Sequence, residues 1–186
     1  MNAKYLYPDA IADGAWREAP LNDPDLRIIE CTTYLDPPRA NTGAAYSIRN
    51  ARPEFEASHI PNACLIDLQK DFSDASVTSN LRFMMPKSDV LGAAFAEVGV
   101  CDGSKVVLYS RDSLMWSTRV WWMLRAIGFD NAAVLDGGYE KWCLEGRPTS
   151  RSVGRPARAT LTIKARPEVF VDKEVVKAAI GDPNVC

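Results

Sequence analysis

Short apolar runs alternate with amphipathic stretches along most of the chain. Apolar and β-branched runs bounded by turn-forming or charged residues predict strands at 26–31, 63–68, 105–109 and 132–135. Helical periodicity between these runs predicts helices near 53–57, 89–98, 117–127 and 138–145. Strands that alternate with helices of this length favour an α/β fold, in which a central parallel sheet has helices on both faces.

A polar loop follows the strand predicted at 105–109 and leads into the helix predicted at 117–127. This arrangement points backbone N–H groups and a helix N-terminus at whatever the loop holds, so it is a candidate anion site. The first loop position, where a sulfur nucleophile would stand, is Ser110. The candidate residues for an anion-binding or interface loop are Ser110, Arg111, Trp116 and Arg119.

The helix after this loop is apolar over a wide arc. Its apolar stripe has the spacing i, i+4, i+7, i+8, i+11 and comprises Trp116, Val120, Met123, Leu124 and Ile127. Trp121 and Trp122 fall on either side of the stripe, and Arg119 and Arg125 flank the tryptophans. So wide an arc indicates either a broad core helix or cover by a second domain or partner. In the second case the two arginines are candidates for interface contacts.

The composition changes near residue 150, so we expect one domain over 1–149 and an interdomain linker over 150–170. The linker is small and basic at first, then alternates at 160–164 as an extended, half-buried piece would. Over 171–186, Asp172 is placed to cap a helix at 173–180 that Gly181 ends, and 184–186 begins another strand. These residues predict the opening of a second, truncated domain.

The net charge and the search for targeting and membrane segments narrow the classes of partner that we expect. The net charge is −2 and the basic residues are scattered, which argues against a nucleic-acid partner. Neither a signal peptide nor an apolar run of about 20 residues is found, so we expect no membrane partner and a cytoplasmic location.

The five cysteines are widely spaced and the only histidine is His59, so we expect no metal site. Cys31 and Cys64 fall in predicted strands and Cys143 in a predicted helix, which favours reduced, buried side chains. Cys101 precedes a turn and is expected to be exposed. Neither Cys101 nor Cys186 lies in a loop suited to carry sulfur.

Four ordered segments resemble the rhodanese (sulfurtransferase) family, in particular the N-terminal domain of tandem-domain thiosulfate and 3-mercaptopyruvate sulfurtransferases. They are F-E-A-S-H-I-P-N-A at 55–63, F-M-M-P at 83–86, R-V-W-W-M-L-R at 119–125 and V-L-D-G-G-Y-E-K-W at 134–142. The resemblance implies a rhodanese-like fold, no cofactor, a small sulfur-containing anion as substrate, and a second rhodanese domain as partner.

The same resemblance implies sulfur transfer through a cysteine persulfide in a loop like the one that begins at Ser110. A serine hydroxyl cannot carry a persulfide, so we expect no catalytic residue in this chain and catalysis in a missing second domain. Phe83 stands where mercaptopyruvate enzymes of the family tend to have histidine, which favours thiosulfate as donor. Asn62 replaces a usual glycine, a change that asparagine tolerates at positive φ.

Individual polar residues are expected to be structural. His59 resembles the family's turn histidine, bonded to nearby backbone. Asp136 begins an Asp-Gly-Gly segment typical of a turn and helix cap. Arg111 and Asp112 are expected to pair on the loop surface.

Two rival functions stay open on the sequence. The chain could be a stand-alone binding or regulatory module that uses its 110–116 loop to hold an anion or partner. A phosphatase is the third hypothesis, and it too requires the absent cysteine.

Overall fold

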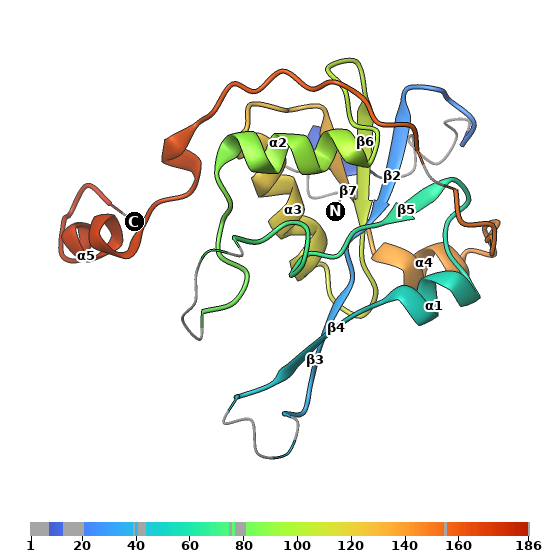
Figure 1. The fold of residues 1–186 in the computed structure, drawn as a ribbon, viewed down its shortest axis with the longest axis horizontal. Helices are drawn as coiled ribbons and strands as arrows, with labels where there is room; N and C mark the ends of the chain where they lie inside the picture. Colours follow the sequence, from blue (N-terminus) through green and yellow to red (C-terminus); the bar gives the residue numbers. More distant parts are fainter. Residues whose placement is uncertain are drawn as a thin grey trace, which may run out of the picture.

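A computed structural model describes residues 8–12, 21–38, 40, 44–74, 76, 81–154 and 156–185. Its main sheet has five parallel strands in the order β1-β7-β6-β2-β5 (Figure 1). The strands are β1 Ile11–Ala12, β2 Leu26–Glu30, β5 Ala63–Leu65, β6 Lys105–Tyr109 and β7 Ala132–Leu135. The predicted α/β class with a central parallel sheet is confirmed.

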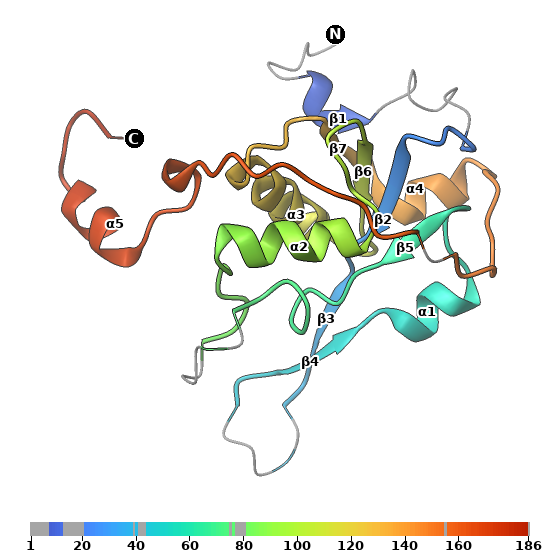
Figure 2. The same ribbon diagram turned by 45° about the horizontal axis from the view of Figure 1, so that its top comes forward.

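Helices cover both faces of this sheet, as predicted. Helices α2 (Ser88–Glu97) and α3 (Met115–Ala126) lie on one face, and α1 (Arg52–Ala57) and α4 (Gly138–Leu144) lie on the other (Figure 2). Strand β6 shows the two-residue alternation directly. Its Val106 and Leu108 pack in the α2/α3 core, and its Val107 and Tyr109 pack in the α1/α4 core. Burial on both faces explains why this strand reads as an unbroken apolar run.

Several predicted boundaries are wrong by a few residues. The strand predicted at 63–68 ends at Leu65, because Ile66 N–H makes a last bond to the Glu30 carbonyl (3.1 Å) and the chain then turns. The helix predicted to start at residue 117 starts at Met115, whose N–H donates to Ser113 Oγ at 3.2 Å. The apolar stripe locates the buried face of a helix but not the polar contact that begins it.

An antiparallel hairpin that the sequence did not predict follows β2. Its strands β3 (Thr33–Asp36) and β4 (Ser47–Asn50) form a separate two-stranded sheet. Arg49 stabilises it, because its guanidinium lies 4.3 Å from the Tyr34 ring centre and pairs with Asp36 (3.1 Å) and Glu54 (2.9 Å). Hairpin strands this short carry little periodic signal.

Residues 156–166, which the sequence places in a linker, lie along α2 and α3, and we call them the strap. Ala159 N–H donates to the Ala96 carbonyl (2.9 Å), Lys164 N–H to Ile127 (2.9 Å) and Arg166 N–H to Ala126 (2.7 Å). Within it, Leu161 and Ile163 are half-buried against the core and alternate with exposed residues. The predicted half-buried alternation is confirmed, whereas the domain boundaries remain a prediction.

Two carboxylates fasten the strap. Asp102 accepts bonds from the N–H and hydroxyl of Thr162 (both 2.7 Å), and Asp130 accepts a forked pair from Arg166 (2.7 and 2.6 Å). The Thr162 N–H lowers the pKa of Asp102, and the Arg166 hydrogen bonds lower the pKa of Asp130, both below the usual 3.8. A carboxyl group whose pKa is depressed by folding stabilises the fold above its unfolded pKa and loses that contribution as the pH falls through its folded pKa.

We therefore expect Asp130→Asn to lower the melting temperature at about pH 6 and the difference from the parent to vanish near about pH 2. The measurement is thermal unfolding across this pH range. Asp71→Asn is the control, since no ion-pair partner of Asp71 lies among the residues described. A deficit for Asp130→Asn that stayed constant down to the acid limit would contradict the assignment.

The C-terminal residues form a short 3₁₀ turn η3 (Pro167–Val169) and a helix α5 (Lys173–Ala179). Asp172 Oδ1 accepts from the N–H groups of Glu174 (2.9 Å) and Val175 (3.0 Å), which confirms the predicted cap. Helix α5 buries no residue and stands apart from the sheet (Figure 1). The strand predicted at 184–186 is not formed at 184–185, and Cys186 lies outside the described residues. None of the described helices is long and apolar enough to cross a membrane.

Candidate functional site

The loop between β6 and α3 begins with a buried serine. Ser110 is 1% exposed. Its Oγ donates to the Ser113 carbonyl (2.6 Å) and lies 3.1 Å from Ser117 Oγ. The hydroxyl is therefore engaged inside the protein and turned away from solvent.

The backbone of this loop is also occupied. Arg111 N–H donates to Thr32 Oγ1 (3.1 Å), and Asp112 N–H donates to the Glu140 carboxylate (3.2 Å). Asp112 adopts a positive φ of 61°. The loop thus offers an N–H group to an anion, as its geometry predicts, but that anion is a carboxylate of α4.

The guanidinium of Arg111 points into the fold. Its Nε donates to Glu30 Oε1 (2.6 Å), and its Nη2 donates to the Ser58 carbonyl (2.5 Å). The group also stacks on Tyr139, 3.8 Å from the ring centre. The predicted surface pair with Asp112 is wrong, because the fully buried Glu30 carboxylate is a stronger partner than an exposed one.

Glu30 is the centre of this network, and the sequence did not single it out. Tyr109 OH donates to Glu30 Oε2 (2.6 Å), and Thr32 Oγ1 donates to Oε1 (3.0 Å). Burial, followed by the charge of Glu30, raises the pKa of Tyr109 well above its usual value. A glutamate that ends an apolar strand was the signal available, since a buried carboxylate requires a cation or several donors nearby.

Trp116 and Arg119 belong to α3, on the side of the sheet opposite the network of Glu30 and Arg111. Trp116 is 7% exposed, and its ring centre lies 5.0 Å from that of Phe83. Arg119 Nη2 donates to the Phe83 carbonyl. The structure therefore brings Trp116 and Arg119 together through Phe83. It separates the other two, because the Ser110 hydroxyl bonds within the loop and to Ser117 of α3, whereas the Arg111 guanidinium bonds Glu30. Arg125 lies against the Trp121 ring and pairs with Asp130 at 3.3 Å.

Of the residues expected to be structural, His59 and Asn62 behave as predicted, whereas Asp136 does not cap the helix. His59 is fully buried, with Nδ1 2.6 Å from the Phe55 carbonyl oxygen and Nε2 3.2 Å from that of Ser152. Asn62 adopts φ 64°, as its replacement of glycine requires. Asp136 lies in a turn, but Gly137 occupies the helix cap and the Asp136 carboxylate pairs with Lys141 (2.5 Å).

The cysteines differ in exposure and acidity. Cys31 and Cys64 are buried as predicted, whereas Cys143 is exposed, because α4 turns that position away from the sheet. Burial raises the pKa of Cys64 to about 12 and that of Cys31 well above its usual value. Cys101 is half-buried, and the hydrogen bond with the Ser104 hydroxyl lowers its pKa.

We expect an alkylating reagent at about pH 8 to label Cys101 and Cys143 in the native protein well before Cys31 and Cys64, because the thiolate is the reactive form. Peptide mass spectrometry at successive times measures the order. Unfolding in denaturant is the control that makes all of these thiols react. Early labelling of Cys64 in the native state would contradict the buried placement.

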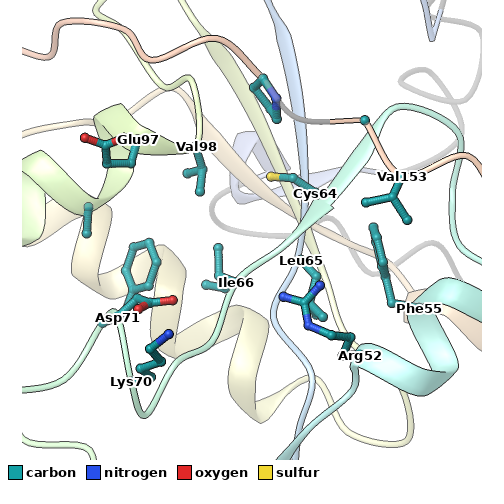
Figure 3. A pocket seen from close by; sticks show the side chains of 14 residues that line it. Arg52, Phe55, Cys64, Leu65, Ile66, Lys70, Asp71, Glu97, Val98 and Val153 are labelled. Atoms are coloured by element: carbon teal, nitrogen blue, oxygen red, sulfur yellow. The ribbon is translucent and has the colours of Figure 1, made fainter.

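A hollow of about 770 Å³ lies at the β5 edge of the sheet. Figure 3 shows charged side chains of both signs around it, Arg52 and Lys70 with Asp71 and Glu97, and Cys64 within it. The only thiol there has a pKa of about 12, so the hollow lacks a sulfur nucleophile. No group of three or more potential metal ligands occurs among the residues described.

Comparison with known proteins gives one consistent family. Residues 15–145 match the rhodanese-like domain family. Thiosulfate/3-mercaptopyruvate sulfurtransferase 2 of Arabidopsis thaliana is 32% identical over 142 residues, which cover 76% of this chain and 38% of the relative. Human 3-mercaptopyruvate sulfurtransferase is 32% identical over 161 residues, covering 86% of this chain and 50% of the relative. The chain thus spans half or less of the length of these relatives.

The fold also resembles that of solved structures of this class. The crystal structure of SseA from Escherichia coli, described as a 3-mercaptopyruvate sulfotransferase, superposes with a TM-score of 0.74 at 26% identity. The match covers 90% of this chain and 60% of SseA. Sequence and structure therefore agree on the class of protein that this chain resembles.

Proposed function

The chain belongs to the rhodanese family, and from that membership we propose that it is the N-terminal, non-catalytic half of a sulfurtransferase. The parent protein moves sulfane sulfur from thiosulfate to cyanide or a thiol. The observation that carries this proposal is Ser110, a buried serine at the head of the loop in a chain that matches sulfurtransferases over half or less of their length.

The proposed reaction requires a thiolate that this chain does not place in its loop. In the parent protein a cysteine thiolate attacks the outer sulfur of thiosulfate, the S–S bond of thiosulfate breaks, and sulfite leaves with the electron pair. Cyanide then attacks the outer sulfur of the persulfide, which releases thiocyanate and restores the thiolate. A second rhodanese domain supplies the cysteine, and residues 171–186 are its opening segment.

The donor is assigned to thiosulfate in preference to 3-mercaptopyruvate on account of Phe83. This residue has no titratable group, and its ring is committed to Trp116 at 5.0 Å. It offers neither a proton nor a charge to the carboxylate and ketone of 3-mercaptopyruvate.

Thiocyanate formation from thiosulfate and cyanide tests the proposal. We expect turnover by the protein translated from the complete reading frame and none above the blank by residues 1–186. Turnover by residues 1–186 would refute the non-catalytic role. Absence of turnover in the longer protein, or a reading frame that ends at residue 186, would favour a stand-alone binding module.

Ser110→Cys in residues 1–186 is a stringent companion test. The new sulfur would lie beside the Ser113 carbonyl, and Glu140 holds the N–H of Asp112. Burial and nearby carbonyl and carboxylate oxygens disfavour a thiolate, so we expect no thiocyanate from this variant. Turnover by Ser110→Cys would mean that the loop is a competent cradle that lacks only its sulfur.

A further inference from the structure

The hollow of about 770 Å³ at the edge of the sheet, which we call the β5 hollow, has the composition of a ligand site. Its floor includes the buried apolar side chains of Phe55, Ile66 and Phe72. Charged side chains of both signs surround this floor (Figure 3). A volume of about 300–1,000 Å³, an apolar lining and a few polar groups are typical of sites for small molecules.

The charges around the β5 hollow are only partly compensated by the fold. Glu97 is paired with Arg158 of the strap at 3.1 Å, and Arg52 lies 3.7 Å from a carboxylate of its own helix. The side chains of Lys70 and Asp71 have no ion-pair or hydrogen-bond partner in the part of the chain that the structure describes. Two cations and two carboxylates nearly cancel, so the hollow favours a ligand that carries both charges and no net charge.

The outer edge of β5 adds backbone groups to the hollow. Ile66 N–H donates to the Glu30 carbonyl (3.1 Å), so the backbone of Ile66 faces β2. Successive residues of a strand direct their N–H and C=O groups to opposite sides, so those of Leu65 face the outer edge. Leu65 lines the hollow, and among the described strands none pairs with β5 on that side. The backbone of an extended peptide can satisfy such a donor and acceptor together.

We propose that the β5 hollow binds a short extended peptide with free ends and apolar side chains. Its ammonium group pairs with Asp71, its carboxylate pairs with Arg52, and its backbone pairs with Leu65. In the view of Figure 3, Asp71 lies at one end of the opening and Arg52 lies across Ile66 from it. Arginine suits a terminal carboxylate because its planar guanidinium donates two parallel hydrogen bonds. This site is separate from the proposed sulfur transfer and does not depend on it.

Isothermal titration calorimetry of residues 1–186 with the dipeptide leucyl-leucine tests the site. We expect a dissociation constant of about 1 mM or lower, which is ordinary for a ligand of this size. N-acetyl-leucyl-leucine lacks the ammonium group and leucyl-leucinamide lacks the carboxylate, and each is expected to bind at least about threefold more weakly. Free leucine is expected to bind at least about tenfold more weakly, because it lacks the peptide group and one apolar side chain.

Two variants assign the charges, and each is the matched control for the other. Asp71→Asn is expected to bind leucyl-leucine and its N-acetyl form within about twofold of each other, while it keeps its preference over the amide. Arg52→Met is expected to bind leucyl-leucine and its amide within about twofold of each other, while it keeps its preference over the N-acetyl form. Both substitutions replace exposed side chains, and thermal unfolding verifies that the variants fold.

Amide hydrogen exchange measured by NMR tests the pairing with β5. The exchange of Leu65 N–H with solvent is expected to slow about tenfold or more when leucyl-leucine saturates the protein, because that group gains an acceptor. The N–H of Gly103, in the turn before β6, is the internal control and keeps its exchange rate.

Each contrary result overturns a stated part of the proposal. Absence of binding at about 10 mM leucyl-leucine overturns the site itself. Equal affinities for leucyl-leucine, its N-acetyl form and its amide overturn the roles of Asp71 and Arg52. Free leucine that binds as tightly as the dipeptide overturns the pairing with Leu65 and assigns the hollow to a single amino acid. The thiocyanate assay is independent of all these measurements, so the proposed function stands or falls separately.

Discussion

Arg111→Ala is expected to lower the free energy of unfolding by about 3–5 kcal/mol, because it leaves a buried carboxylate without its cation. Glu30 is fully buried, and the side chain of Arg111 is only 11% exposed, so solvent screens the pair weakly. The substitution also removes the stacking on Tyr139 and the bond to the Ser58 carbonyl. Denaturant unfolding monitored by tryptophan fluorescence measures the loss.

A double substitution separates the charge from the packing. Glu30→Leu combined with Arg111→Met replaces both partners by apolar side chains, and we expect it to recover more than half of the loss. Arg52→Ala removes an arginine of an exposed pair on α1, with Glu56 at 3.7 Å, and is expected to change stability by less than about 1 kcal/mol. A loss for Arg111→Ala as small as for Arg52→Ala would show that Glu30 does not depend on its cation.

Gly138→Ala is the second change with a large expected effect, about 2–4 kcal/mol of destabilisation. Gly138 has φ +60°, and a Cβ there would lie 2.5 Å from the backbone carbonyl oxygen of Ser110. Because this distance is too short, the backbone of either α4 or the loop must move, and the start of α4 would separate from the loop at Ser110. The bond from Tyr139 N–H to that carbonyl (3.2 Å) would break as well.

Gly146→Ala is the matched control, because Gly146 has φ +67° and an added Cβ would meet nothing within 4 Å. In this variant alanine has only to adopt the left-handed backbone conformation, which costs about 1–2 kcal/mol. The difference between the two variants in denaturant unfolding therefore measures the close approach of α4 to the loop. Equal losses of unfolding free energy in the two variants would mean that the loop backbone at Ser110 moves aside at no cost.

The central strands of the fold can be predicted from the sequence, because a strand that is buried on both faces has a continuous run of apolar residues. Strands β6 and β7 match their predicted ranges for this reason. The hairpin β3–β4 was missed, since its half-exposed strands are stabilised by Arg49 contacts with Asp36 and Glu54 that no periodicity encodes. Local pattern predicts which face is buried; it does not predict which distant polar groups meet.

The candidate site shows the same division. The position of Ser110 at the head of a loop before a helix could be predicted, because the strand and the apolar stripe bracket it. The partner of Arg111 could not, since Glu30 lies 81 positions away and reaches it only through the pairing of β2 with β6. The engagement of Asp112 N–H by Glu140 likewise depends on where α4 comes to lie.

The strap ends at Arg166, and this fixed end limits how far any later part of the chain can extend from the fold. Its last anchor, Arg166, is fixed to Asp130 and to the end of α3, and the next helix begins at Lys173. The intervening residues reach at most about 20 Å when extended. A domain attached through so short a linker would have an effective concentration of about millimolar or more at the surface of α3. Contacts too weak to join two separate proteins would then suffice to hold any domain attached in this way, and cleavage between residues 166 and 173 would release it.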